Sequence, residues 1–185
     1  MHSFTTERLL IRPLSIQDKA LFINLYTDAK VMRNIAAPLS DEKAEKAFNN
    51  TLSIMNKAQP KIMSWAIVNI IDNRAIGIQG FTWSPMKNGP LSNTKPSVAE
   101  IGIMLLRSSS GKLLPEEAIG SLIEYGFKHL KLEQINACFT KENLATARVS
   151  KKAGFVCNLK ENKDEPGQRI ESVFKNNWLR SYIKL

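Results

Sequence analysis

The sequence predicts a mixed α/β domain of the α+β kind, in which about seven strands form a largely antiparallel sheet flanked by about four helices. The first observation is a strand, a turn and a helix in succession: residues 98–106 are apolar, residues 107–112 are polar, and Pro115 opens a helix that runs to Lys131. The second observation is a further strand at residues 132–139, directly after that helix. Because a helix crosses between these two strands, we expect them to be the one parallel pair in the sheet.

The first third of the chain predicts a strand followed by two helices. Residues 8–14 form a short apolar strand. Ser15 and Asp18 then make a capping pair that starts a helix. A second helix follows Ser40, because the apolar positions in residues 44–55 keep helical spacing.

The middle of the chain predicts a hairpin and a long loop. Residues 63–69 and 75–82 have strand character and are separated by turn residues. Trp65 and Trp83 in this region favour core positions over ligand stacking. Residues 84–97 contain three prolines, so they form either a substrate cover or a mobile connection.

The last part of the chain predicts one helix and several short strands. Asn143 opens the helix and Gly154 closes it. A strand, a charged turn at residues 160–168 and two strand-like pieces, around Val173 and at residues 178–185, complete the chain.

The composition fits one domain with its own core. A chain of 185 residues with 43% hydrophobic residues can fill one sizeable core, so we expect a single domain over residues 1–185. No apolar run approaches the roughly 18 residues of a membrane span, and the first residues carry no export-signal pattern. Cys138 and Cys157 lie in apolar stretches, which favours two buried thiols in a reducing compartment. We therefore expect a soluble cytoplasmic protein with no membrane association.

The formal net charge of +9 is compatible with a nucleic acid, an acidic cofactor or a solvated surface. The basic residues are spread along the chain without interleaved aromatic residues, which argues against a dedicated nucleic-acid surface. His2 and His129 lack metal-ligand spacing, so no metal site is expected.

The turn after residues 98–106 is a candidate anion site, because free backbone N–H groups at a helix start point outward. It contains one glycine, Gly111, where phosphate-binding loops often have two or three, so an ordinary strand-to-helix connection is the alternative. Glu100 is the one carboxylate of the preceding strand. It either points to water or is half-buried and poised to accept a proton.

Several segments in a fixed order carry a family resemblance. They are residues 6–14, 64–68, 75–77 and 99–106, then Gly111-Lys112, Glu117-Ala118 and Glu142-Asn143-x-x-Thr146-x-Arg148-Val149-x-x-Lys152-x-Gly154-Phe155. This pattern resembles the GNAT acetyltransferases, and within them the RimJ/RimL type, which acetylates protein N-termini or related amines. The resemblance covers nearly the whole chain.

The resemblance implies a GNAT fold in which the two parallel strands splay apart and admit the pantetheine arm of the co-substrate acetyl-CoA. The strand backbone at Met104, Leu105 and Leu106 would pair with that arm, and the pyrophosphate would lie on the following turn. The other cofactor contacts that the resemblance implies are Arg107, Gly111, Lys112, Leu113, Leu114 and Asn143.

The resemblance also implies roles for polar side chains. Glu100 would take a proton from the amine, directly or through water, because an ammonium cannot attack a thioester. Thr146 would lie near the thioester sulfur and assist the leaving thiolate, with a backbone-bonding role as the alternative. Asn143 would contact the cofactor in addition to capping its helix. The first helices would flank the acceptor groove, with residues 31–35 at the amine.

The turn departs from the family pattern, which has Gln or Arg at Ser108, Gly or Ala at Leu113 and often a small hydroxyl residue at Glu116. Leu113 adds a side chain where the backbone must approach phosphate. Glu116 adds a negative charge, and two like charges about 5 Å apart repel by roughly 3 kcal/mol at an effective dielectric near 20. Arg107 and Lys112 would offset much of this, together with a basic edge made of Arg148, Lys151 and Lys152.

We therefore predict an enzyme, a GNAT N-acetyltransferase that transfers an acetyl group from acetyl-CoA to a primary amine, with a protein N-terminus as one candidate acceptor. It would act as a monomer or homodimer. A non-catalytic GNAT-like interaction module with weakened CoA binding is the alternative, motivated by Leu113 and Glu116. An RNA-associated factor is a third hypothesis, suggested by the net charge.

Overall fold

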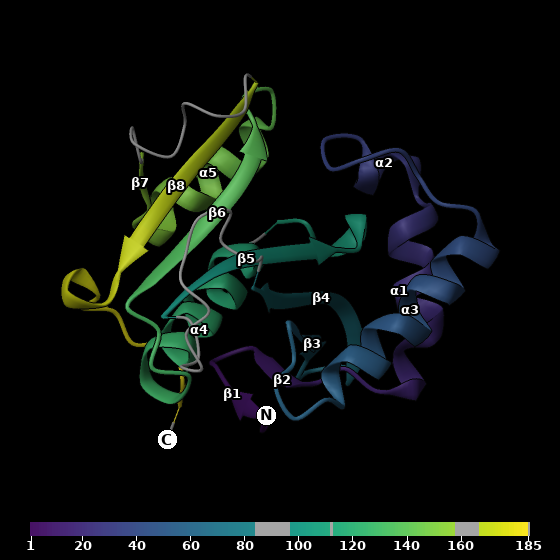
Figure 1. Ribbon diagram of the computed structural model, residues 1–185, viewed down its shortest axis with the longest axis horizontal. Coiled ribbons are helices and arrows are strands. Elements are labelled where there is room, and N and C mark those ends of the chain that lie inside the picture. The colour runs from purple at the N-terminus through teal and green to yellow at the C-terminus, as the bar shows by residue number, and fades with distance from the viewer. Residues whose placement is uncertain (84–96, 112, 158–166, 185) are drawn as a thin grey trace.

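The computed structural model describes residues 1–83, 97–111, 113–157 and 167–184. Eight strands form one sheet in the order β1-β2-β3-β4-β5-β6-β8-β7 (Figure 1). The strands are β1 (Phe4–Thr5), β2 (Leu9–Pro13), β3 (Ile62–Asn69), β4 (Arg74–Thr82), β5 (Val98–Leu105), β6 (Gln134–Thr140), β7 (Val156–Cys157) and β8 (Gln168–Phe174). The helices are α1 (Lys19–Thr27), α2 (Ala29–Met32), α3 (Asp41–Met55), α4 (Leu114–His129) and α5 (Leu144–Ala153), with 3-10 turns η1 (Ile16–Asp18), η2 (Arg107–Ser109) and η4 (Lys175–Asn177).

Among the described strands, β5 and β6 are the one parallel pair, and the other neighbours pair antiparallel. This confirms the predicted mixed, mostly antiparallel sheet. The helix α4 connects β5 to β6, and such a crossover is what lets two consecutive strands run in the same direction. The structure adds a two-residue strand at one edge, β1, which is too short to leave a pattern in the sequence. The strand predicted after Phe155 is β7, which has two described residues at the other edge.

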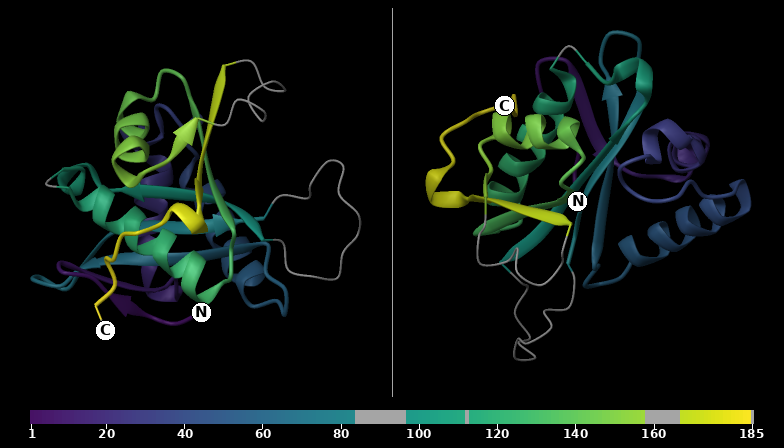
Figure 2. Two further views of the ribbon diagram at one scale, coloured as in Figure 1. Left: turned by 90° about the vertical axis from the view of Figure 1, so that its left-hand side faces the viewer. Right: turned by 90° about the horizontal axis from the view of Figure 1, so that it is seen from above.

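The helices cover both faces of the sheet (Figure 2). Helices α1 and α3 pack on one face over an apolar cluster that includes Phe22 and Phe48, which we call the α1–α3 cluster. Helix α4 packs on the other face over a larger cluster, which α5 joins through Ala153 and which we call the α4–α5 cluster. Trp65 and Trp83 belong to this larger cluster, which confirms their predicted core positions.

The start of α1 follows the predicted capping pair. The backbone N–H of Ser15 donates to Asp18 Oδ2 at 2.9 Å. The guanidinium of Arg12 donates two further hydrogen bonds of 2.7 Å to the same carboxylate. Asp18 is buried, so this cluster fixes the end of β2 against the beginning of the helix.

The C-terminal residues do not form the strand predicted at residues 178–185. Within the described residues they make a single isolated bridge, between Thr5 and Lys184. The carboxylate of Glu124 on α4 accepts hydrogen bonds from the backbone N–H groups of Tyr182 and Ile183, at 2.6 and 3.0 Å. The backbone donors that a strand would direct at a neighbouring strand are therefore bound by a helix side chain.

The prediction of two buried thiols is wrong for Cys157, and Cys138 is only partly buried. Cys138 on β6 is half-buried, but Cys157 is exposed because it lies on the short edge strand β7. Most of the predicted loop at residues 84–97 and most of the predicted turn at residues 160–168 lie outside the described residues. Of the helices that the structure describes, none is long and apolar enough to cross a membrane.

Candidate active site

The strands β5 and β6 pair over three residues and then separate. The last pair of their parallel register joins Glu100 to Asn136. Beyond it, β5 continues to Leu105 against β4, whereas β6 continues to Thr140 against β8, and Figure 1 shows the two strands diverging. This confirms the predicted splaying. In the described part of the chain, the edge of β5 from residue 101 to 105 that faces away from β4 has no strand partner.

Glu100 lies half-buried at the point of separation. Side chains alternate along a strand, and Met104, which has the same parity as Glu100, packs against the α1–α3 cluster. Glu100 therefore faces the side of the sheet that carries α1 and α3. Beside it on β6, Asn136 Oδ1 accepts hydrogen bonds from Gln134 Nε2 at 2.7 Å and from Ser172 Oγ at 2.8 Å. A polar network thus lies next to Glu100 at the start of the gap.

The residues implied for the pantetheine arm form the end of the unpaired edge. Leu105 is buried on the α4 side, whereas Met104 and Leu106 pack against the α1–α3 cluster. The backbone N–H of Leu106 donates to the Ile76 carbonyl at 2.8 Å, which holds this end of β5 against β4. At Met104 and Leu105 the backbone is extended and its outer edge has no strand partner among the described residues, as a main-chain contact requires, whereas the Leu106 carbonyl accepts from the Ser109 N–H at 2.8 Å.

The predicted anion-binding turn begins with η2, which contains Arg107 in an exposed position. Gly111 is exposed, and a Cβ added there would meet nothing within 4 Å. The described fold therefore has room for a side chain at this position. Lys112 lies outside the described residues. The Leu114 N–H donates to the Gly111 carbonyl at 3.0 Å, which closes the turn before α4.

Leu113 precedes α4 in a left-handed conformation, with φ 61° and ψ 14°. This conformation is unfavourable by about 1–2 kcal/mol for a residue with a Cβ, which is a physical reason for glycine in the family pattern. The Leu113 side chain is 58% exposed, so the chain itself does not bury it. Within the described residues, no acceptor is found for the backbone N–H group of Leu113, so this group can bind a ligand.

Glu116 on α4 forms an ion pair with a lysine on α5. Its Oε1 lies 3.0 Å from Nζ of Lys152 on α5. The negative charge that the sequence placed beside the turn is therefore partly neutralised by a residue of the predicted basic edge. This pair connects the beginning of α4 to the end of α5. Arg180 of the C-terminal segment donates a hydrogen bond to the Lys152 carbonyl at the same place.

Asn143 caps α5, as predicted. It is buried, and its Oδ1 accepts a hydrogen bond from the Thr146 N–H at 3.1 Å. The cap uses the amide oxygen, so the amide NH₂ is the group that can contact a ligand. Thr146 is half-exposed, and no hydrogen bond of its hydroxyl to the described residues is found. By contrast, Thr51 Oγ1 donates to the Ala47 carbonyl at 2.9 Å, which is the backbone-bonding alternative that Thr146 does not adopt.

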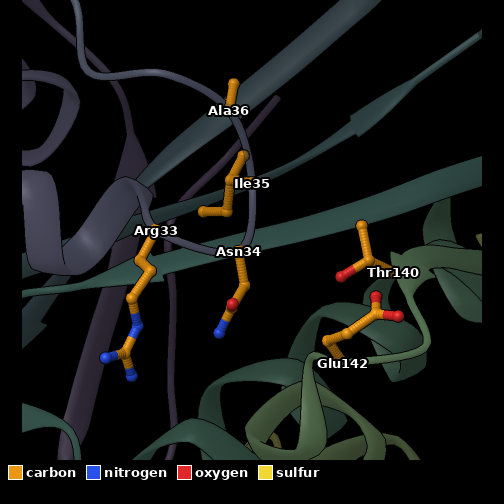
Figure 3. A pocket seen from close by; sticks show the side chains of 6 residues that line it. All are labelled: Arg33, Asn34, Ile35, Ala36, Thr140 and Glu142. Carbon is orange, nitrogen blue, oxygen red and sulfur yellow. The ribbon is translucent and has the colours of Figure 1, made fainter.

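An open cleft of about 370 Å³ lies between the α2–α3 connection and the end of β6 (Figure 3). Residues 33–36 form one wall, and Thr140 and Glu142 form the other. Thr140 has the same strand parity as Asn136, the neighbour of Glu100, so the cleft opens on the face that carries α1 and α3. The cleft and Glu100 are therefore on the same side of the sheet.

Asp28 at the start of α2 connects this wall to the turn electrostatically. Hydrogen bonds from the backbone N–H groups of Lys30 and Val31, at 2.7 and 3.2 Å, lower the pKa of Asp28. The positive charge of Arg107 lowers that pKa further, by a smaller amount. Asp28 and Arg107 thus have opposite charges close enough to interact. No cluster of three or more His, Cys, Asp or Glu side chains that could hold a metal is found among the described residues.

A comparison with known families decides the assignment. The family described as acetyltransferase (GNAT) domain matches residues 8–156, which is more than half of the chain. The chain belongs to the GNAT acetyltransferase family. Its members are acyltransferases, so this chain is an enzyme of that kind, and the non-catalytic alternative is not favoured.

Individual relatives agree with this assignment. The uncharacterized N-acetyltransferase p20 of Bacillus licheniformis is 28% identical over 159 residues, which are 84% of this chain and 83% of the relative. A GNAT-family acetyltransferase structure from Bacillus anthracis has a TM-score of 0.74 at 22% identity and covers 94% of this chain and 99% of its own.

Two further structures share the fold at 18% identity. Spermidine N-acetyltransferase from Vibrio cholerae, solved in complex with CoA and spermine, has a TM-score of 0.71 and covers 94% of this chain and 99% of its own. Ribosomal-protein-S5-alanine acetyltransferase from Vibrio fischeri has a TM-score of 0.70 and covers 97% of this chain and 100% of its own. These likenesses establish the GNAT fold.

GNAT enzymes use acetyl-CoA, and this chain has groups that fit it. The unpaired edge of β5 offers extended backbone, Leu113 offers a backbone N–H before α4, and Gly111 leaves room for a close approach. The exposed side chain of Leu113 does not delete this backbone donor.

Proposed function

We propose that this GNAT enzyme transfers the acetyl group of acetyl-CoA to a primary amine at the gap between β5 and β6. The observation that supports this most is the separation of the two strands beyond Glu100, because it leaves the outer backbone edge of β5 without a strand partner among the described residues. Glu100 lies at the point of separation and faces the α1–α3 side. Thr146 lies in the first turn of α5, which packs on the opposite side of the sheet.

The chemistry divides between these two residues. Acetyl-CoA supplies the acetyl thioester. A primary amine is mostly protonated at neutral pH, so it needs a base before it can act as a nucleophile, and the Glu100 carboxylate takes that proton directly or through one water. The Thr146 hydroxyl is available to donate to the leaving sulfur, while the Asn143 amide NH₂ holds the cofactor beside it.

The fold alone does not choose the acceptor. The spermidine and ribosomal-protein acetyltransferases have nearly equal TM-scores of 0.71 and 0.70 to this chain, although their names give very different acceptors. A protein N-terminus, as in the RimJ/RimL type, is therefore one candidate among primary amines. A cytoplasmic location and a monomeric or homodimeric state stay predictions.

The test is release of free CoA thiol from acetyl-CoA in the presence of small amines and peptides. Glu100→Gln should lower kcat by about 10²–10⁴-fold and should flatten the pH dependence between pH 6 and 9, because the base is gone. Glu45→Gln on the exposed surface of α3 is the matched control and should keep full rate. Full activity of Glu100→Gln across this pH range would remove Glu100 from the mechanism.

A further inference from the structure

The cleft on the acceptor side has walls of opposite charge. Arg33 and Asn34 extend in the same direction from the α2–α3 connection, and the Glu142 carboxylate lies on the opposite wall (Figure 3). No ion pair of Arg33 or Glu142 is found among the described residues. Arg8, in contrast, pairs with Glu117 at 2.6 Å, and Arg12 pairs with Asp18 at 2.7 Å. Arg33 therefore keeps its donors available in a cleft that shares a face with Glu100.

We propose that the acceptor is a small amine that also carries an anionic group, a carboxylate or a phosphate, which Arg33 and Asn34 bind. The proposal rests on the function proposed above and narrows its substrate class. A guanidinium presents a planar fork of donors that matches both carboxylate and phosphate, and the Asn34 amide adds a neutral donor beside it. Glu142 repels an anion from the opposite wall, so the acid group is directed to the Arg33 side.

The cleft is suited to such a ligand and not to a polyamine. Its volume of about 370 Å³ is at the small end of the range for small-molecule sites. A polyamine has several spaced cations and needs a group of carboxylates, but Glu142 is the one carboxylate among the described residues that line the cleft. A second cation on the acceptor would also meet Arg33, which repels it.

The experiment compares amines that differ only in the acid group. Amino acids of graded length, their amides and the matching aminoalkyl phosphonates are assayed for CoA release. The acids or phosphonates should have kcat/KM at least about tenfold above the amides, because a charge-assisted hydrogen bond is lost in the amide. Arg33→Gln should remove that difference by slowing the acidic substrates about tenfold or more, with less than about a twofold change for the amides. The comparison of carboxylates with phosphonates identifies which anion the site takes.

A control variant separates binding from general electrostatics. Lys30→Gln removes the same charge from α2, three residues away and outside the cleft walls, and should leave both rates unchanged. The Kd of CoA should be the same in Arg33→Gln as in the wild type. Equal rates for acids and amides, an equal effect of Lys30→Gln, or loss of CoA binding in Arg33→Gln would each overturn the proposal.

A second measurement keeps this result distinct from failure of the proposed function. If no amine is acetylated although CoA binds, the proposed transfer is wrong. Calorimetry of the CoA-loaded protein with N-acetyl amino acids and their amides then decides the ligand class. Tighter binding of the acids that Arg33→Gln abolishes supports the anionic site, and equal binding of acids and amides overturns it.

Discussion

Single charged residues beside the turn set the electrostatics of the cofactor site. The ion pair between Glu116 and Lys152 means that each residue offsets the effect of the other on a polyphosphate. Glu116→Gln removes a negative charge and releases the Lys152 ammonium. We expect CoA to bind about tenfold more tightly to this variant. A partly exposed pair with Lys152 leaves only part of the roughly 3 kcal/mol by which Glu116 would repel a phosphate charge about 5 Å away.

The control for this prediction is Glu133→Gln, which breaks a similar pair with Lys175 at the start of β6. It should leave the Kd of CoA unchanged. The gain in Glu116→Gln should shrink at high salt, because screening weakens interactions between exposed charges. An unchanged Kd in Glu116→Gln at low salt would show that the phosphates lie elsewhere.

Residue-scale roles were predicted best where they depend on local sequence. Asn143 was predicted as a helix cap from its position alone, and the cap is present. The partner of Glu116 was not predicted as such, because Lys152 is 36 residues away in sequence. The network of Asn136 with Ser172 was missed for the same reason, although the alternating polar residues Gln134 and Asn136 were visible in the sequence.

At the scale of elements, the cap of α5 allows two roles of Asn143 to be separated. Asn143→Ala removes the cap and should destabilise the protein by about 1 kcal/mol, whereas Asn143→Ser keeps a capping oxygen and should cost little. Both variants lack the amide NH₂, so both should bind CoA more weakly. Urea unfolding and calorimetry measure the two effects, and undiminished CoA binding in Asn143→Ser would mean that Asn143 is a cap alone.

Two glycines that face each other across β4 and β5 offer a second element-scale test. Gly80 and Gly102 are paired in the register. A Cβ on Gly80 would lie 2.4 Å from the Met63 carbonyl oxygen, whereas a Cβ on Gly102 meets nothing within 4 Å. Gly80→Ala should lower the free energy of unfolding by about 1–3 kcal/mol, because the neighbouring backbone must move. Gly102→Ala is the matched control and should be neutral or stabilising by up to about 1 kcal/mol. Equal stability of the two variants would contradict the packing.

Elements whose apolar residues repeat with a clear helical or strand period were predicted from the sequence, and elements without such a repeat were not. The strands β5 and β6 and the helix α4 follow from apolar spacing, and their parallel pairing follows from the crossover. The C-terminal segment has strand-like residues, yet Glu124 binds its backbone through a contact 58 residues apart in sequence. No local pattern encodes such a contact. The segment 31–35 that the resemblance placed at the acceptor groove overlaps one wall of the cleft, but the opposite wall, Thr140 and Glu142, was not predicted, because the α2–α3 connection and the end of β6 meet only in the folded chain.

At the scale of the whole molecule, α4 ties both ends of the described chain to the sheet through two buried carboxylates. Glu117 accepts hydrogen bonds from Thr6 Oγ1, at 2.5 Å, and from the backbone and side chain of Arg8, at 2.9 and 2.6 Å. Glu124, two helical turns later, binds the C-terminal segment, and its Oε1 pairs with Lys128. The helix that begins at the candidate cofactor turn is thus anchored along its length by segments from both termini.

These two carboxylates predict how the fold responds to acid. Burial alone would raise the pKa of Glu117, but the hydrogen bonds from Thr6 and Arg8 outweigh it and lower that pKa. Burial would likewise raise the pKa of Glu124, but the hydrogen bonds from Lys128 and from the backbone N–H groups of the C-terminal segment lower it. A carboxyl group whose pKa is lower in the folded state adds stability above its unfolded pKa of about 4.3, and this stability is lost as the pH falls through the folded value.

Glu117→Gln and Glu124→Gln should therefore each lower the free energy of unfolding by about 1–3 kcal/mol at pH 7, because a buried set of donors loses its charged acceptor. The difference from wild type should shrink as the pH falls below about 4, where the wild-type carboxylates also become protonated. Urea unfolding at pH 7 and at acid pH measures both quantities, with the exposed Glu133→Gln as the control that changes neither. A stability difference that is the same at both pH values would mean that the side chains contribute packing and not charge. Loss of CoA affinity in Glu117→Gln, measured while the protein is still folded, would show in addition that the anchoring of α4 fixes the geometry of the turn that precedes it.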